Sequence, residues 1–341
     1  RPGTSARDLD SDGPVAKLSS NELADPPIPE VVAAIAAAAG EVNRYPDNTR
    51  TALRAALAAE LGVDAGRIWA GGASNELGTL LAIAFGGPGR TIAYPWPSFS
   101  LYPIATRTAG CEAIEVPLDA GHRVDLDGMR RALRDDTTVV FVCNPNNPSA
   151  THVPFDDLEA FVASVPEDVL VVVDEAYHEF ATAPDHGSAV GLAAERPNVA
   201  VTRTFSKAHG LAGLRLGYVV ADPGILDGIR RIQIPFTVTE LAMAGAIESL
   251  RHPDVVADRV ARVVAGRDLL TRELRVRGVP VTDSQTNFVY AELGDEADRI
   301  VAGLLAEGVI VRVVPPEGFV RISVGTDDET KRFLEAFDRV S

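Results

Sequence analysis

Cysteine is scarce in this chain. Only two occur among 341 residues, Cys111 and Cys143, in apolar surroundings and with neither a CxxC spacing nor a paired-histidine spacing nearby. The pattern argues against a disulfide scaffold and against a zinc site, and it favours a reducing cytoplasm. The histidines show no metal-like spacing either, so we expect no metal. Four of them are expected at the surface: His122, His178, His186 and His252.

Long apolar runs and an excess of positive charge are also missing. No segment reaches the length of a membrane span, and no signal peptide is visible in a sequence that begins at Arg1. The formal net charge is −16, which disfavours nucleic acid as a partner because phosphate backbones require clustered Lys and Arg. Apolar residues make up 46% of the chain, as in a globular protein with one large domain or two coupled ones.

Short apolar strands alternate with helices through much of the chain. Strands are predicted at 67–70, 91–94, 112–116, 138–143, 169–173 and 199–202, and helices at 51–61, 75–85, 98–109 (interrupted at Pro103), 126–133 and 155–165. The run Val169–Val173 is continuously apolar, which is typical of a strand covered on both faces. The alternation predicts an α/β fold of three layers, with a mostly parallel sheet between helices.

Different patterns flank this unit. A polar, proline-rich arm precedes an Ala-rich helix at 31–40. After Pro235 we predict helices at 239–250, 253–277, 295–307 and 328–339, and strands at 288–291, 310–314 and 320–324. The chain is therefore expected to have three parts: an arm with the first helix (1–40) that joins the small domain, a large domain (41–245) and a small α+β domain (246–341).

Polar side chains follow three of the predicted strands. Asn147 follows one strand, Asp174 and Tyr177 follow the next, and Lys207 follows the third. Ligands of open parallel sheets bind beyond the carboxyl ends of the strands. If these strands share one sheet edge, an amide, a carboxylate, a phenol and an amine meet in one crevice.

This combination suits pyridoxal 5′-phosphate (PLP). Lys207 can supply the amine of a Schiff base. The charge of Asp174 would raise the pKa of the pyridine nitrogen and keep it protonated. Asn147 and Tyr177 can donate hydrogen bonds to the ionised ring hydroxyl.

The phosphate and the ring face need further groups. Hydroxyls, cations and the amides of a helix N-terminus bind phosphate, and these are offered by Ser74, Asn75, Thr204, Ser206 and Arg215. Phe99 could stack on the ring, with Tyr94 and Trp96 as weaker candidates.

Six motifs in a fixed order extend this reading. They are Lys17–Glu22, Asn43–Asp47, Ala73–Glu76, Asn144–Pro148, Asp174–Tyr177, and Arg203–Lys207 with Gly213–Tyr218. The chain, from about Lys17 to its C-terminus, resembles the fold-type I PLP aminotransferases and is closest to the histidinol-phosphate aminotransferase family. Within that family it is most similar to the actinobacterial branch called aromatic or phenylalanine aminotransferases.

The resemblance implies a role for each residue. Lys207 carries the cofactor, Asp174 pairs with the ring nitrogen, Asn147 and Tyr177 bind the ring hydroxyl, and Phe99 stacks on the ring. The implied phosphate ligands are Ser74, Asn75, Ser206 and Arg215.

Other implied roles concern the substrate and a second subunit. Tyr45 matches a tyrosine that reaches the phosphate of the neighbouring subunit, which implies a homodimer with shared active sites. Arg321 matches the arginine that clamps the substrate α-carboxylate, for which a planar fork is suited. Arg312 matches a supporting arginine, and Asn21 an arm residue near the substrate.

The chain departs from the family pattern at a few positions. Ser149 and Ala150 replace the Thr and Gly that usually follow Asn-Pro, which predicts a slightly altered turn. Ala73 stands where glycine is usual and constrains the backbone. His209 replaces a Tyr or Phe, and we expect it to pack rather than to act in catalysis.

Each residue taken alone also has a simpler reading. Lys207 could be a solvated surface residue, Asp174 a helix N-cap, the Asn144–Pro148 run a turn and Phe99 a core residue. Arg321 alternates with apolar neighbours and could point to solvent. The glycines near Gly71 lack the GxGxxG spacing of a dinucleotide site.

The resemblance implies ping-pong transfer of an amino group between an aromatic L-amino acid and 2-oxoglutarate, with Lys207 as the general base. Histidinol phosphate of histidine biosynthesis is the alternative amino donor, and its phosphate would require further cations. Decarboxylation of threonine phosphate is a third reaction on the same scaffold. A transcription regulator is disfavoured because no helix-turn-helix domain fits before Lys17.

Overall fold

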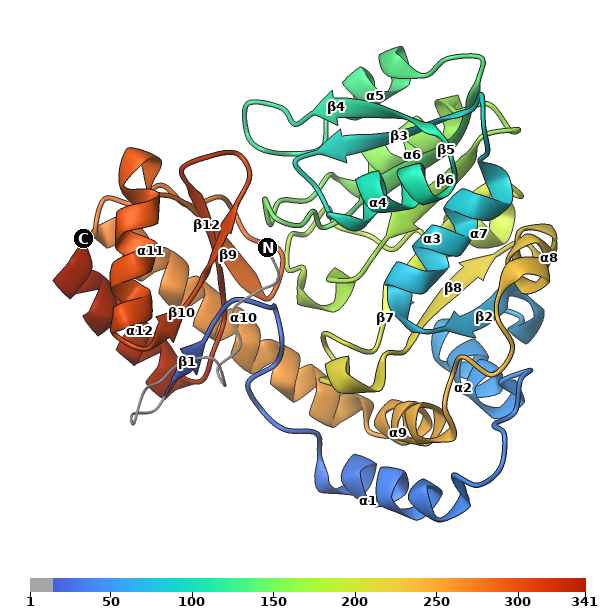
Figure 1. Cartoon of the computed structure of the whole chain (residues 1–341), viewed down its shortest axis with the longest axis horizontal. Coiled ribbons are helices and arrows are strands. Elements are labelled where there is room, and N and C mark those ends of the chain that lie inside the picture. The colour runs from blue at the N-terminus through green and yellow to red at the C-terminus, as the bar shows by residue number, and fades with distance from the viewer. Residues whose placement is uncertain (1–14) are drawn as a thin grey trace.

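Seven strands form the central sheet of the larger unit (Figure 1). The computed structural model describes residues 15–341. The strands are β2 (Ile68–Gly71), β3 (Thr91–Trp96), β4 (Glu112–Pro117), β5 (Thr137–Cys143), β6 (Leu170–Asp174), β7 (Val199–Thr204) and β8 (Gly217–Ala221). Their order is β2-β8-β7-β6-β5-β3-β4, and β8 alone runs in the direction opposite to the other six strands. The predicted mostly parallel sheet is confirmed, whereas β8 was not predicted.

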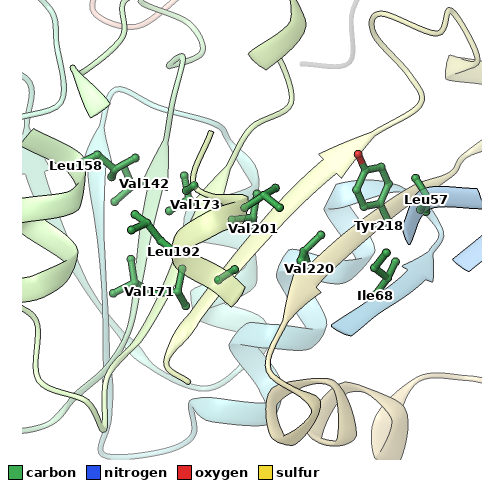
Figure 2. Packing of buried hydrophobic residues seen from close by; sticks show 14 of the residues in the cluster. Leu57, Ile68, Val142, Leu158, Val171, Val173, Leu192, Val201, Tyr218 and Val220 are labelled. Atoms are coloured by element: carbon green, nitrogen blue, oxygen red, sulfur yellow. The ribbon is translucent and has the colours of Figure 1, made fainter. Parts of the chain in front are cut away.

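A row of β-branched residues crosses the sheet and explains its stability. Val142, Val173, Val201 and Val220 are register partners on successive strands, and Ile68 continues the row on β2. All five are fully buried on one face. In Figure 2, Leu158 and Leu192 lie at the Val142 and Val173 end of the row, and Leu57 lies towards the Ile68 end. Branched side chains suit a pleated surface of this kind, and full burial of each contributes about 1.5–3 kcal/mol.

Helices cover both faces, so the predicted three layers are present. One face packs residues of α2 (Thr51–Leu61), α5 (Leu126–Ala132), α6 (Phe155–Ser164), α7 (Val190–Glu195) and α9 (Glu240–Leu250). The other packs residues of α3 (Ala73–Phe85), α4 (Leu101–Thr108) and α8 (Pro223–Ile232). The predicted interruption at Pro103 is wrong, because α4 begins at Leu101 and proline is tolerated in a first turn.

A smaller α+β unit follows the long helix α10 (Pro253–Val276), which runs between the two units in Figure 1. Its antiparallel sheet has the order β11-β12-β9, formed by β9 (Phe288–Glu292), β11 (Arg312–Val314) and β12 (Phe319–Ser323). Helices α11 (Ala297–Ala306) and α12 (Asp327–Val340) complete it. The strand predicted at 310–314 is divided, since β10 (Val309–Ile310) pairs elsewhere.

The N-terminal arm joins this small unit. Its strand β1 (Ala16–Lys17) pairs in parallel with β10, and Leu18 is buried in the small unit's core. Helix α1 (Pro29–Ala38) instead packs against α9, and its Val31 belongs to the core of the large unit. The part of the predicted arm before residue 15 lies outside the described residues, and the boundaries at residues 40 and 245 stay predictions. Within residues 15–341, no helix combines the length and the apolar character needed to cross a membrane.

Candidate active site

The three predicted strand ends do meet. Strands β5, β6 and β7 are adjacent and parallel, so their carboxyl ends open on one cavity of about 530 Å³. The arm, the first turn of α3 and strands β11 and β12 close the other sides. Thirteen of the fourteen predicted site residues line it: Asn21, Ser74, Asn75, Phe99, Asn147, Asp174, Tyr177, Thr204, Ser206, Lys207, Arg215, Arg312 and Arg321.

Lys207 directs its amine towards the arm. Its Nζ donates to the carbonyl of Asn21 at 2.9 Å and to that of Ser20 at 3.4 Å. Burial, with the positive charge of Arg321 as the next cause, lowers the pKa of Lys207 from 10.5 to about 7. A large share of the amine is therefore neutral near pH 7, as a nucleophile and base require.

Asp174 ends β6 with its carboxylate buried. Burial raises the pKa of Asp174 to about 6, and its Oδ2 accepts a hydrogen bond from the Tyr102 hydroxyl at 3.3 Å. Its Oδ1 has no hydrogen-bond partner among the described residues. Sequence reasoning missed Tyr102, because a buried tyrosine in a helix, here stacked on Phe141 at 4.7 Å, has the pattern of a core residue.

Arg321 faces the cavity rather than solvent. Its guanidinium donates to Asn147 Oδ1 at 2.7 Å and to the Ser19 carbonyl at 2.8 Å. Its neighbour across the β11–β12 pair is Arg312. Burial lowers the pKa of Arg321 from its usual value, although a guanidinium stays charged at neutral pH. Two arginines thus concentrate positive charge at one end of the cavity, in a chain with a net negative charge.

Asn21 connects the arm to the site. It has a left-handed backbone (φ 54°), and its Nδ2 donates to the Tyr177 hydroxyl at 2.9 Å. Tyr177 therefore accepts one hydrogen bond and keeps its own proton to donate. Burial raises the pKa of Tyr177 to about 12, so the phenol remains protonated. Asn147 also keeps a free donor group. Its side-chain oxygen accepts a hydrogen bond from Arg321, and its NH₂ group remains able to donate.

A tight turn at the start of α3 supplies backbone amides. We call Gly72–Asn75 the phosphate turn. Ala73 has φ 75°, and a Cβ at Gly217 would lie 2.7 Å from the backbone nitrogen of Ser74. Both alanines that replace a usual glycine, Ala73 and Ala150 (φ 64°), therefore have a left-handed backbone conformation, which alanine adopts less readily than glycine. The N–H groups of a first helical turn lack intrahelical acceptors and bind anions.

The side chains fit PLP. Several buried oxygens lack hydrogen-bond partners within residues 15–341, and three of them belong to residues that line the cavity: Ser19 Oγ, Asp174 Oδ1 and Ser206 Oγ. An unsatisfied buried polar atom is costly. A protonated ring nitrogen would satisfy Asp174, and phosphate would accept from Ser206. Tyr177 and Asn147 retain donors for the ring hydroxyl, and Lys207 has its amine in the same cavity. The individual roles stay predictions.

Some residues lie elsewhere. Tyr45 does not line the cavity; it is 82% exposed and stacks on Phe236 with ring centroids 4.6 Å apart. His209 packs on Phe205 and contacts the Ser249 hydroxyl at 2.9 Å, outside the cavity. Tyr94 bonds Glu115 instead of facing the cavity.

The four histidines expected at the surface are only partly exposed. His178 and His186 contact each other at 2.9 Å, and His122 packs on the Tyr290 and Phe319 rings. His252 contacts Glu248 at 3.0 Å. Across residues 15–341, no group of three or more His, Cys, Asp and Glu is arranged to hold a metal ion.

Comparison with known proteins agrees with this geometry. The family model described as aminotransferase class I and II matches residues 14–337. An aromatic amino acid aminotransferase of Cutibacterium acnes is 43% identical over 323 residues, which are 95% of this chain and 92% of the relative. A histidinol-phosphate aminotransferase of Thiobacillus denitrificans is 41% identical over 340 residues, 98% of this chain and 88% of the relative.

A solved structure agrees as well. The histidinol-phosphate aminotransferase of Sinorhizobium meliloti, in complex with pyridoxal 5′-phosphate, superposes with a TM-score of 0.90 at 29% identity. The match covers 96% of this chain and 92% of that one.

Proposed function

Because this chain belongs to the class I and II aminotransferase family, we propose that it transfers an amino group between an aromatic L-amino acid and 2-oxoglutarate. It is a PLP-dependent aminotransferase. The observation that carries the proposal is the amine of Lys207, which lies with Asp174 in one cavity at the carboxyl edge of the sheet.

Lys207 is proposed to move the proton. Bound PLP supplies an electron sink for the charge that develops at the substrate Cα. The Lys207 Nζ, with its pKa near 7, can accept the proton from the substrate Cα and then donate it to a carbon of the bound cofactor. The carbonyl of Asn21, 2.9 Å away, orients the amine. Asp174 holds a proton on the ring nitrogen by its negative charge.

Arg321 is proposed to bind the substrate α-carboxylate. Its Nε is buried and lacks a hydrogen-bond partner within residues 15–341, while its other nitrogens are held by Asn147 and Ser19. A carboxylate that exchanged with these contacts would gain a bidentate charge-assisted pair. Arg312, on the neighbouring strand, adds positive potential that attracts the carboxylates of both the amino acid and 2-oxoglutarate.

The aromatic substrate class rests on the relatives and on the cavity walls. Trp96, Phe99, Val314 and Pro315 contribute apolar surface, and aromatic side chains pack well on such walls. Histidinol phosphate is the second candidate, favoured by the relative that is 41% identical and carries that name. Arg312 is the cavity cation that could face its phosphate.

A donor panel tests these assignments. The enzyme with 2-oxoglutarate should convert phenylalanine and tyrosine at least about 100-fold more efficiently than histidinol phosphate, a difference of roughly 2.7 kcal/mol in transition-state binding. The reverse preference would establish the second candidate. Carbon dioxide released from threonine phosphate, in place of a keto acid, would assign the chain to decarboxylation.

Replacing Lys207 tests the chemistry itself. Lys207→Ala should abolish the visible absorbance that depends on the covalent bond between Lys207 and the cofactor, and lower turnover by about 10⁴-fold, since it removes nucleophile and base together. Normal turnover in this variant would contradict the assignment. Lys331→Ala, on the exposed surface of α12, is the matched control.

A homodimer with shared sites and a cytoplasmic location complete the proposal. The exposed Tyr45 and Phe236 rings form an apolar pair that a second subunit could cover. The two cysteines are free thiols, in keeping with a reducing compartment.

A further inference from the structure

Gln233 lies at the centre of a buried hydrogen-bond network outside the cavity. Its Oε1 accepts from Trp69 Nε1 at 2.7 Å and from Arg50 NH2 at 3.3 Å. Its Nε2 donates to Glu76 Oε2 at 3.3 Å. Only one orientation of the amide presents oxygen to the two donors and NH₂ to the carboxylate. No other neutral side chain of this size offers both functions.

One branch of the network leads to the phosphate turn. The Glu76 carboxylate accepts from the backbone N–H of Gly72 and so ties the turn back onto α3. Ala73, Ser74 and Asn75 line the cavity immediately after this tie. Gln233 holds the carboxylate from the other side, which fixes the position of the turn.

The second branch leads to the segment that carries Tyr45, residues 43–48, which we call the Tyr45 loop. Arg50 is 1% exposed, lies 4.4 Å from the centre of the Trp69 ring and donates to the carbonyl of Asn48. Asn48 Oδ1 accepts from Phe236 N at 2.8 Å, and the Phe236 ring stacks on Tyr45.

Arg50 needs these contacts because it is deeply buried. It forms no carboxylate ion pair within 4 Å among the described residues, and its Nε has no hydrogen-bond partner there. The side-chain oxygen of Gln233, the backbone carbonyl of Asn48 and the Trp69 ring therefore compensate for its charge. The carboxylates of Glu76 and Asp47 add attraction at longer range. A change at Gln233 will shift Arg50, and with it the Tyr45 loop.

We propose that Gln233 is a positioning residue for the cofactor phosphate, which holds the phosphate turn of its own subunit and the Tyr45 loop that serves the neighbouring subunit. The inference rests on the proposed function, in which PLP occupies the cavity of a homodimer with shared sites, and on the family resemblance, which implies that Tyr45 reaches the phosphate of the neighbouring subunit. Its consequence is that one buried amide adjusts phosphate binding at two active sites.

The first experiment compares PLP with pyridoxal, which lacks the phosphate. Gln233→Glu keeps the acceptor for Trp69 and Arg50 but places a carboxylate against Glu76, which loosens the turn. Titration of the full-length chain, followed by the visible absorbance of the bound cofactor, should show PLP affinity about tenfold weaker or more. Pyridoxal affinity should remain within about twofold.

Two further variants make the test specific. In the double variant Gln233→Glu with Glu76→Gln, the new amide at position 76 can donate a hydrogen bond to the new carboxylate at position 233. This variant should recover PLP affinity to within about threefold of the wild type. Gln285→Glu repeats the substitution at the chain's other glutamine, which is buried and accepts from the backbone of Thr182 and Ala183. It should leave both affinities unchanged.

The second experiment tests the Tyr45 branch. Gln233→Met removes all three hydrogen bonds, and Tyr45→Phe removes the hydroxyl that the proposal places at the phosphate. If Gln233 acts partly through the Tyr45 loop, the combined loss of PLP affinity will be smaller than the product of the two separate losses. If the loss of PLP affinity in the double variant equals the product of the two single losses, Gln233 does not act through the Tyr45 loop.

Other outcomes separate the inference from the proposed function. Equal weakening of PLP and pyridoxal by Gln233→Glu, no weakening, or no recovery in the double variant would each overturn the positioning role. A wild-type chain that develops no bound-cofactor absorbance with PLP would instead contradict the proposed function. Thermal unfolding of each cofactor-free variant shows whether a change extends beyond the site.

Discussion

Lys207 shows how burial prepares a side chain for chemistry. Folding lowers its pKa from 10.5 to about 7, so the folded chain releases a proton that the unfolded chain retains between these values. Stability must therefore rise with pH across this window, because the unfolded state binds more protons there. Below about pH 7 the amine is charged and buried, and its full desolvation cost remains.

This argument predicts a pH-dependent effect of Lys207→Met on the cofactor-free chain. The free energy of unfolding of the variant minus that of the wild type should fall between pH 7 and pH 10, by up to about 1.4 kcal/mol per pH unit. Urea denaturation at several pH values measures it. A difference that is constant or rises with pH would show that the native amine is not neutral.

Asp174 gives the second prediction at this scale. Asp174→Asn keeps the shape of the side chain but removes the charge that holds a proton on the ring nitrogen. The kcat should fall at least about 100-fold, which corresponds to two pKa units at that nitrogen. Steady-state kinetics measure the loss. Asp168→Asn, exposed in the loop before β6, should retain full activity, and an active Asp174→Asn enzyme would refute the role.

At the scale of elements, β8 lies so close to the phosphate turn that there is no room for a side chain at Gly217. A Cβ on Gly217 would lie 2.7–2.9 Å from backbone atoms of Ser74, Arg203 and Ala73, and backbone atoms cannot rotate away. We predict that Gly217→Ala displaces the turn and weakens PLP binding by about tenfold or more. Gly191→Ala meets no atom within 4 Å and should leave the PLP dissociation constant unchanged.

The sequence was most informative about buried parallel strands. Strands β5, β6 and β7 each contain an apolar run that is followed by polar residues, so both their positions and their convergence could be predicted. Strand β8 and helix α8 were missed. Gly217 and Tyr218 of β8 were read only as part of the Gly213–Tyr218 motif. Helix α8 has no continuous apolar run, although its buried residues Ile225, Leu226 and Ile229 have helical spacing.

Only the parts of the site formed by side chains of recognisable sequence motifs could be predicted. Backbone groups have no such signal, so the carbonyls of Ser19 and Ser20, which contact Arg321 and Lys207, were missed. Gln233 was missed for a similar reason, because it lies alone at the end of α8 and its partners come from distant segments. Long-range pairing of this kind is set by tertiary structure.

For the whole molecule, the position of Tyr45 makes a prediction about assembly. If the sites are shared, Lys207 and Tyr45 of one active site come from different subunits. Lys207→Ala and Tyr45→Phe therefore each remove a group that a different subunit contributes to that site. In a mixed dimer, the subunit with an intact Lys207 receives a wild-type Tyr45 from its partner. The mixture should therefore regain sites with wild-type PLP affinity, about tenfold tighter than those of Tyr45→Phe alone.

Measurement of this effect requires subunit exchange. The two variants are mixed, exchanged and titrated with PLP, and the size of the assembly is followed by sedimentation. Each chain is 36.1 kDa, so a dimer has twice that mass. No tight-binding fraction after proven exchange would mean that Tyr45 does not reach a neighbouring site.

The path of the arm has a consequence for biosynthesis. Asn21, which holds Lys207, is itself held by Ser323, 302 residues later. A ribosome therefore completes the strand ends β5–β7 and the phosphate turn long before the arm can find β10 and β12. A nascent chain that meets the cofactor has the groups for its ring and phosphate but not the paired arginines. The arm can therefore complete this end of the site only after the sheet that contains β12 has been synthesised.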